Sequence, residues 1–188
     1  MRIVFMGTPD FAVGSLQALC ESGKHEILAV VTQPDRPKGR GNKLLQTPVK
    51  EYALAQGLTV YQPQKVKTPE FVELLHELQP ELIVVAAFGQ FLSKEILELP
   101  KYGCINVHAS LLPKYRGAAP IQYAIIKGEK ESGVTIMQMD IGMDTGAMLD
   151  KVVVPIEENT TMGELHYALR EQGAALLLQV IDKIAAGT

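Results

Sequence analysis

The segment CINVHASLLPKYRG, residues 104–117, places an asparagine and a histidine where both can act on one substrate. Side chains alternate between the two faces of a strand, so Asn106 and His108 share a face with Cys104. An amide N–H or an imidazolium can stabilise the oxyanion of a tetrahedral intermediate. Either residue alone is more often a buried group bonded to backbone. Both together, followed by a loop with Pro and Gly, favour a site.

A second polar cluster, MQMDIGMDTGAM at 137–148, places Asp140 and Asp144 around a turn broken by glycine. A turn aspartate most often accepts hydrogen bonds from its own backbone. A carboxylate near an imidazole can instead orient the ring, raise its pKa and help to move a proton from an attacking amine. Asn, His and Asp in one cleft therefore predict acyl transfer without a protein nucleophile.

Other chemistries have less support in the same segments. Cys104 and His108 are four residues apart, about 13 Å along an extended strand, which is too far for a nucleophile–base pair. Cys104 is therefore expected in the core. No serine or threonine stands in a nucleophile-elbow context. Metal is not expected, because His108 has no second histidine at ligand spacing. The other histidines are expected on the solvated surface: His25, His76 and His166.

Alternation of apolar and amphipathic segments indicates which elements position these residues. The first half predicts a mostly parallel sheet covered by helices on both faces, with strands at 2–6, 26–32, 59–61 and 82–88 and helices at 10–22, 48–56 and 69–78. Shorter connections in the second half predict a mixed or antiparallel edge built from CINVH, GVTIMQM and AMLDKVVVP. A helix at 161–186 follows. The expected fold is a three-layer, Rossmann-like α/β domain.

The first strand–helix turn reads GTPDFAVGS and matches neither a dinucleotide-binding nor a P-loop pattern. Thr8 or Asp10 is expected to cap the helix, with Pro9 in its first turn.

The segment TQPDRPKGRGNKLLQTP, residues 32–48, gathers positive charge in a chain whose formal net charge is −3. Its Gly and Pro content predicts an irregular loop rather than a helix or strand. A loop after the second strand can project from the rim of the proposed site, and cations there suit phosphates. The four cations are Arg36, Lys38, Arg40 and Lys43. The alternative is an ordinary solvated loop.

Composition indicates one soluble domain. The 188 residues are 47% hydrophobic and 21% charged, and no apolar run reaches the length of a membrane span. Two cysteines form no disulfide framework, and the N-terminus lacks a signal-peptide pattern, so a cytoplasmic location is expected. Nothing indicates an obligate protein partner.

INVHASLLPKYRGAAPIQ together with GVTIMQMDIGMDTG closely resembles the formyltransferase family that uses 10-formyltetrahydrofolate, and the likeness covers essentially all 188 residues. The resemblance implies that Asn106 and His108 hold the formyl oxygen. It also implies that Asp144 partners His108 and assists proton movement through water. No metal is implied. The expected folate contacts are Phe88, Gly89, Gln90, Phe91, Leu92, Ser110, Leu111, Leu112, Pro113 and Asp140.

Within the family, the GTPDFA turn and the basic PDRPKGRGNKL insertion resemble the members that formylate initiator methionyl-tRNA. In those members the insertion enters the acceptor-stem end of the tRNA. The alternatives are formyl transfer to a small amine or nucleotide sugar, hydrolysis of the donor, and an RNA-binding module on a degenerate fold. Family members continue into a C-terminal β-barrel domain that contacts tRNA. Residues 1–188 are therefore expected to be the catalytic domain without that barrel.

Overall fold

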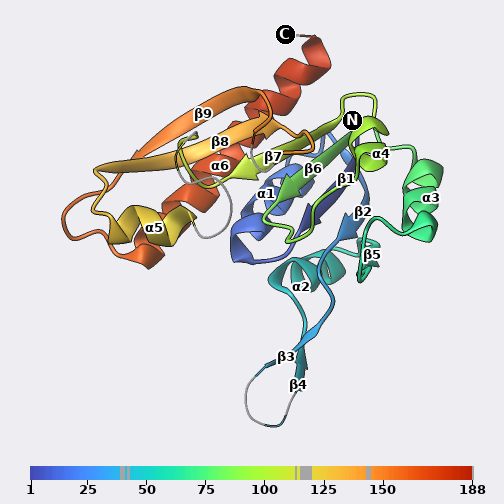
Figure 1. Ribbon diagram of the computed structural model, residues 1–188, viewed down its shortest axis with the longest axis horizontal. Helices are drawn as coiled ribbons and strands as arrows, with labels where there is room; N and C mark the ends of the chain where they lie inside the picture. The colour runs from blue at the N-terminus through green and yellow to red at the C-terminus, as the bar shows by residue number, and fades with distance from the viewer. Residues whose placement is uncertain (39–40, 42, 113, 115–119, 143–144, 188) are drawn as a thin grey trace.

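The computed structural model describes residues 1–38, 41, 43–112, 114, 120–142 and 145–187. Within these residues a seven-stranded sheet forms the centre of the molecule, in the order β5-β2-β1-β6-β7-β8-β9 (Figure 1). Neighbouring strands from β5 to β7 pair in parallel, and β8 and β9 pair antiparallel. The strands are β1 (Arg2–Gly7), β2 (Glu26–Val31), β5 (Val60–Tyr61), β6 (Leu82–Ala86), β7 (Cys104–His108), β8 (Glu131–Gln138) and β9 (Met148–Pro155).

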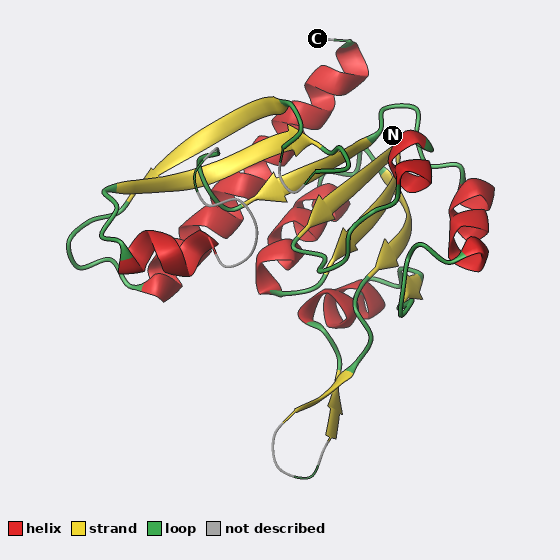
Figure 2. Cartoon of the chain, in the orientation of Figure 1, coloured by secondary structure: helices red, strands yellow, loops and turns green. Residues whose placement is uncertain are grey.

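Helices pack on both faces of this sheet, which confirms the three-layer prediction (Figure 2). Alternate residues of β1 point to opposite faces, as the period of a strand requires. Ile3 and Phe5 belong to the core beneath α1 (Asp10–Glu21) and α6 (Met162–Ala186), whereas Val4 and Met6 pack with α3 (Pro69–Leu78) and α4 (Lys94–Glu98). The remaining helices are α2 (Pro48–Ala55) and α5 (Pro120–Ile126).

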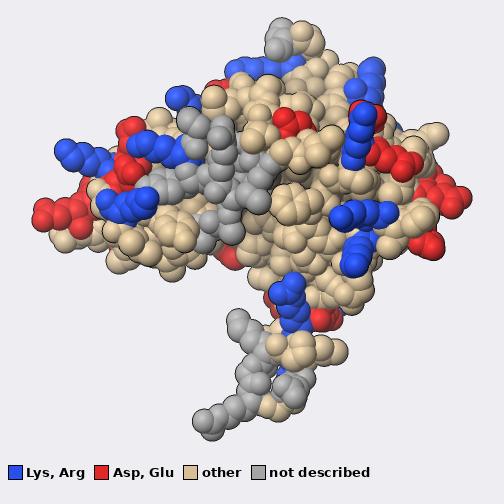
Figure 3. Space-filling view, in the orientation of Figure 1, with Lys and Arg blue, Asp and Glu red and all other residues tan. Residues whose placement is uncertain are grey.

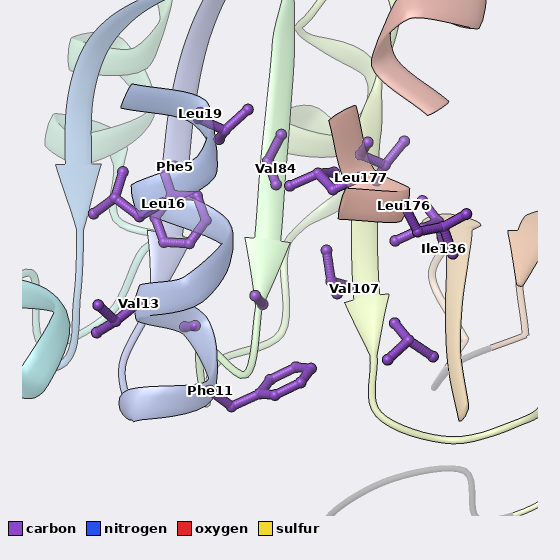
Figure 4. Close-up of a cluster of buried hydrophobic side chains, with 14 of the residues drawn as sticks. Phe5, Phe11, Val13, Leu16, Leu19, Val84, Val107, Ile136, Leu176 and Leu177 are labelled. Carbon is purple, nitrogen blue, oxygen red and sulfur yellow. The ribbon is translucent and has the colours of Figure 1, made fainter. Parts of the chain in front are cut away.

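The 25-residue helix α6 begins with a capping box formed by Thr161 and Glu164. Its buried leucines at helical spacing lie beside α1 and cover the sheet as far as β9. They include Leu165, Leu169, Leu176 and Leu177. Figure 4 shows Leu176 and Leu177 over this face. Among the helices that the structure describes, none is both long and apolar enough to cross a membrane.

The basic segment forms regular structure, so the prediction of an irregular loop was wrong. β3 (Arg36–Lys38) and β4 (Lys43–Leu45) pair antiparallel as a hairpin that extends away from the body below α2 (Figure 1). Pro37 is tolerated because a two-stranded ribbon has an outer edge where its missing N–H costs no ladder hydrogen bond. Gly41, at φ 94°, takes a conformation that favours glycine in the turn.

The cap predicted for the first helix was also wrong. Pro9 is the N-cap of α1, and no side chain bonds to the free N–H groups there. The Thr8 hydroxyl instead donates to the Phe88 carbonyl at 2.8 Å. Both carboxylate oxygens of Asp10 accept from Arg170 of α6, each at 2.8 Å. Both side chains are therefore used in tertiary contacts rather than in capping.

Candidate active site

A cavity of about 590 Å³ opens at the carboxyl ends of β6 and β7, where open α/β sheets place ligands. Its walls come from the residues after β6, from the end of β7, from the start of α1, from α5 and from the turn after β8. The lining is mainly apolar, with a few convergent polar side chains, as is typical of small-molecule sites.

Asn106 and His108 both line this cavity, as their shared strand face predicted. Asn106 pairs with Val85 of β6, and His108 lies opposite Thr135 of β8, so strands on both sides fix their positions. His108 is 7% exposed. The intervening Val107 is buried in the core beneath α6. The site is thus a pair of hydrogen-bonding side chains in a mainly apolar cavity.

Cys104 begins the same strand and is a core residue, as predicted. Its thiol is 1% exposed and lies 3.7 Å from the Ile96 carbonyl. Burial raises the pKa of this thiol to about 12, so it is neutral at physiological pH and a poor nucleophile.

We expect Cys104 to react with iodoacetamide at pH 8 on the order of 10³ times more slowly than a free cysteine, because the thiolate is the reactive form. Peptide mapping by mass spectrometry would measure the rate. The same protein unfolded in urea provides the control and should react fully. Rapid alkylation of the folded protein would contradict the assignment to the core.

The segment after β6 forms the apolar wall. Its backbone leaves the strand through Ala87 at φ 48° and Gly89 at φ 96°. Phe88 is buried, whereas Phe91 is 63% exposed at the rim. All five residues predicted for folate in this segment line the cavity, namely Phe88, Gly89, Gln90, Phe91 and Leu92. Gln90 also accepts from the Val66 N–H at 2.9 Å, which anchors the wall.

The turn after β8 contributes Asp140 to the cavity. One carboxylate oxygen of Asp140 accepts from the Gly142 N–H at 2.9 Å and from the Thr145 hydroxyl at 2.8 Å. This oxygen therefore organises the turn. Asp144, the third member of the predicted trio, lies outside the described residues.

After Ala109, which lines the cavity, the segment that follows β7 turns away from it at residues 110–112. Ser110 and Leu112 are buried, and the Ser110 hydroxyl donates to the Lys114 carbonyl at 2.8 Å. Leu111 packs close to Gly133 of β8. None of these three is among the described residues that line the cavity. Pro113, also predicted here, lies outside the described residues.

His166 of α6 was predicted to be a surface residue, and this was wrong. It lines the cavity, and its ring meets that of Phe11 edge-on with centroids 6.3 Å apart. The sequence signal was its place in the first turns of α6, next to the buried Leu165. His25 is also partly buried, with Nδ1 at 3.4 Å from the N-terminal amine. His76 is exposed as predicted, with its ring 3.4 Å from Glu95.

Three of the predicted RNA-binding cations, Arg36, Lys38 and Lys43, belong to the hairpin. Arg36 and Lys43 are exposed in β3 and β4, and the backbone of Lys38 pairs with Lys43. Arg40 lies outside the described residues. The space-filling view shows the hairpin extending from the body (Figure 3). In the described part of the chain, no three His, Cys, Asp or Glu side chains are arranged to hold a metal ion.

Comparisons of the sequence with known proteins agree on one family. A model of the formyl transferase family matches residues 1–181. The methionyl-tRNA formyltransferase of Clostridium botulinum is 58% identical over 189 residues, covering 100% of this chain and 60% of that protein. That of Caldanaerobacter subterraneus subsp. tengcongensis is 59% identical over 188 residues, with the same coverage of 100% and 60%. The chain therefore spans about 60% of the length of these relatives.

Solved structures share the fold. Glycinamide ribonucleotide transformylase 1 from Symbiobacterium toebii superposes with a TM-score of 0.80 at 20% identity, covering 100% of this chain and 88% of that one. A sugar N-formyltransferase from Shewanella sp FDAARGOS_354 gives 0.73 at 24% identity, covering 100% and 70%. At these identities the likeness shows the fold alone, and it confirms the predicted fold class. With the family model matching nearly its whole length, the chain belongs to the formyl transferase family.

Proposed function

We propose that this chain carries the catalytic site of an enzyme that moves a formyl group from 10-formyltetrahydrofolate to the α-amino group of initiator methionyl-tRNA. The observation that carries the proposal is the placement of Asn106 and His108 together in an apolar cavity at the sheet edge. The relatives named as methionyl-tRNA formyltransferases, above 50% identical, support this acceptor over a small amine or sugar.

The chemistry follows from the two side chains. The amine attacks the formyl carbon, and the formyl oxygen gains negative charge. The Asn106 amide and a ring N–H of His108 donate hydrogen bonds to this oxygen, and the apolar surroundings strengthen the interaction. The bond to the folate nitrogen then breaks, this nitrogen takes up a proton, and the amine loses one. Asp144 is proposed to partner His108 and to move that proton through water.

Folate is proposed to occupy the cavity between the 88–92 segment and the Asp140 turn. Backbone groups of these segments suit the polar edge of a pterin, and Phe88 and Leu92 supply an apolar wall. The folate roles of Ser110, Leu111, Leu112 and Pro113 remain predictions. The proposed chemistry needs no metal.

A donor-consumption assay tests the function. The complete protein is incubated with 10-formyltetrahydrofolate, with and without methionyl initiator tRNA. We expect donor loss only with the charged RNA, matched one to one by N-formylmethionyl-tRNA. Donor loss that ignores the RNA would instead indicate a hydrolase. Donor and RNA binding without turnover would indicate a binding module.

The hairpin is proposed to contact tRNA phosphates through Arg36, Lys38, Arg40 and Lys43. Each neutralised phosphate adds about 0.7–0.9 to the slope of log affinity against log salt. Replacing all four cations with alanine should therefore lower the slope measured between 50 and 200 mM salt by about 3, if each cation neutralises one phosphate.

The matched control is Lys94→Ala on α4, an exposed lysine 3.9 Å from Glu98. It should leave the salt slope unchanged. An equal slope for the hairpin variant and the native protein would show that the hairpin is an ordinary solvated element.

Residues 1–188 are proposed to act as the catalytic domain of a longer enzyme of the cytoplasm, in which a C-terminal domain adds further tRNA contacts. The share of the relatives' length that this chain spans, 60%, supports this organisation.

A further inference from the structure

The hairpin and the cavity wall start from neighbouring strands. β2 leads through residues 32–35 into β3, and β6 leads into the 88–92 segment. Only β1 separates β2 from β6 in the sheet, and all three run parallel. Their carboxyl ends therefore meet at one edge, which brings the base of the hairpin beside the wall of the cavity.

Hydrogen bonds join these two segments directly. The Gln90 amide donates to Gln33 Oε1 at 3.0 Å and to the Pro63 carbonyl at 3.2 Å. The Thr8 hydroxyl, which donates to the Phe88 carbonyl, also accepts from the Gln33 N–H at 3.4 Å. Gln33 is thus bonded to the cavity wall through both its side chain and its backbone.

The two segments also pack closely against each other. Gly89 faces the Gln33 side chain so closely that a Cβ at this glycine would lie 2.8 Å from Gln33 Nε2. Together with the bonds through Gln90 and Thr8, this contact leaves little room for the wall to move without moving Gln33.

The same glutamine is bonded to the base of the hairpin. Gln62 donates to the Gln33 carbonyl at 3.1 Å and to Asp35 at 2.7 Å. Lys50 donates to both oxygens of Asp35, at 3.2 and 2.9 Å. Hydrogen bonds from Gln62 and then from Lys50 lower the pKa of Asp35. Asp35 directly precedes Arg36, the first residue of β3.

We propose that Gln33 is a positioning residue that couples the two substrates: occupation of the cavity by the folate donor tightens RNA binding at the hairpin, and the reverse. This inference rests on the proposed function. A ligand against the 88–92 wall restrains Gln90, which in turn restrains Gln33 through their hydrogen bond. Gln62 and Asp35 pass this restraint from Gln33 to the base of the hairpin. RNA then binds a hairpin that has already lost part of its conformational freedom, so binding costs less conformational entropy. By linkage, the RNA raises donor affinity by the same factor.

The test is a binding cycle with the complete protein. The Kd of uncharged initiator tRNA is measured without and with saturating 10-formyltetrahydrofolate, since uncharged RNA carries no amine to accept the formyl group. We expect the donor to tighten RNA binding by about fivefold or more, the lower end of ordinary coupling. Donor affinity measured with and without RNA should change by the same factor.

Gln33→Ala removes the side-chain acceptor for Gln90 and should bring the coupling factor to within about twofold of one. Gln33→Glu keeps an acceptor oxygen at this position and should retain coupling. The matched control, Gln64→Ala, replaces an exposed glutamine two residues after Gln62 and should also retain it. Because the coupling factor is a ratio, a uniform loss of affinity or stability does not move it.

Two results would overturn the coupling while leaving the proposed function standing: a factor near one in the native protein with transfer intact, or the same factor in the native protein and in Gln33→Ala. Absence of donor or RNA binding in the native protein would overturn both.

Discussion

Replacing His108 with alanine is expected to lower the single-turnover rate of formyl transfer by about 10²- to 10⁴-fold, and replacing Asn106 with alanine by about 10²- to 10³-fold. Both side chains line the cavity and are proposed to donate to the oxyanion. In a buried site such a donor stabilises the transition state far more than it would in water. The rate is measured by rapid quench with excess enzyme over methionyl-tRNA.

His76→Ala is the matched control, because His76 is an exposed histidine on α3, on the opposite face of the sheet from α1 and α6. It should transfer at the native rate. Circular dichroism and thermal melting of all three variants separate lost chemistry from lost folding. Near-native transfer by both folded cavity variants would rule out the proposed roles of Asn106 and His108.

The Thr135→Val substitution is expected to lower the free energy of unfolding by about 2–4 kcal/mol, because it leaves two buried backbone groups without their partner. The Thr135 hydroxyl is fully buried, accepts from the Leu112 N–H at 3.1 Å and donates to the Ser110 carbonyl at 2.6 Å. Valine keeps the shape of threonine but can make neither bond. Urea unfolding monitored by circular dichroism measures the loss.

Thr135→Ser supplies the control, since it keeps the hydroxyl and removes only a methyl group, at about 1 kcal/mol. Thr135 also lies opposite His108 in the sheet, so the valine variant should lower the transfer rate as well. Equal stabilities of the valine and serine variants would show that the two hydrogen bonds contribute little.

Local periodicity was sufficient to predict the sheet and which residues of β7 share a face. Side chains alternate between the two faces of a strand, so Ile105 and Val107 belong to the core beneath α1 and α6, while Asn106 and His108 line the cavity. The short helices α4 and α5 were not predicted. With 5 and 7 residues, they offer too few turns for a helical repeat to stand out.

Contacts between distant segments explain the errors. Asp10 pairs with Arg170, 160 positions along the chain, and nothing in the local GTPDFA sequence reveals this partner. The folate contacts expected of Ser110 and Leu112 stay predictions; the course of the chain there depends on Thr135 of another strand, a partner that the local sequence does not reveal. His166 reaches the cavity because α6 crosses the sheet beside α1.

The place of α6 at residues 162–186 has a consequence for synthesis on the ribosome. Its buried apolar side chains, which continue to Ile181, cover the same face of the sheet as α1 and emerge after all seven strands of that sheet. Until then β8 and β9, the strands that α6 contacts, present uncovered apolar surface, which makes a nascent chain prone to aggregation. Stable folding of this domain therefore has to wait until about 180 residues and the length of the exit tunnel have been translated.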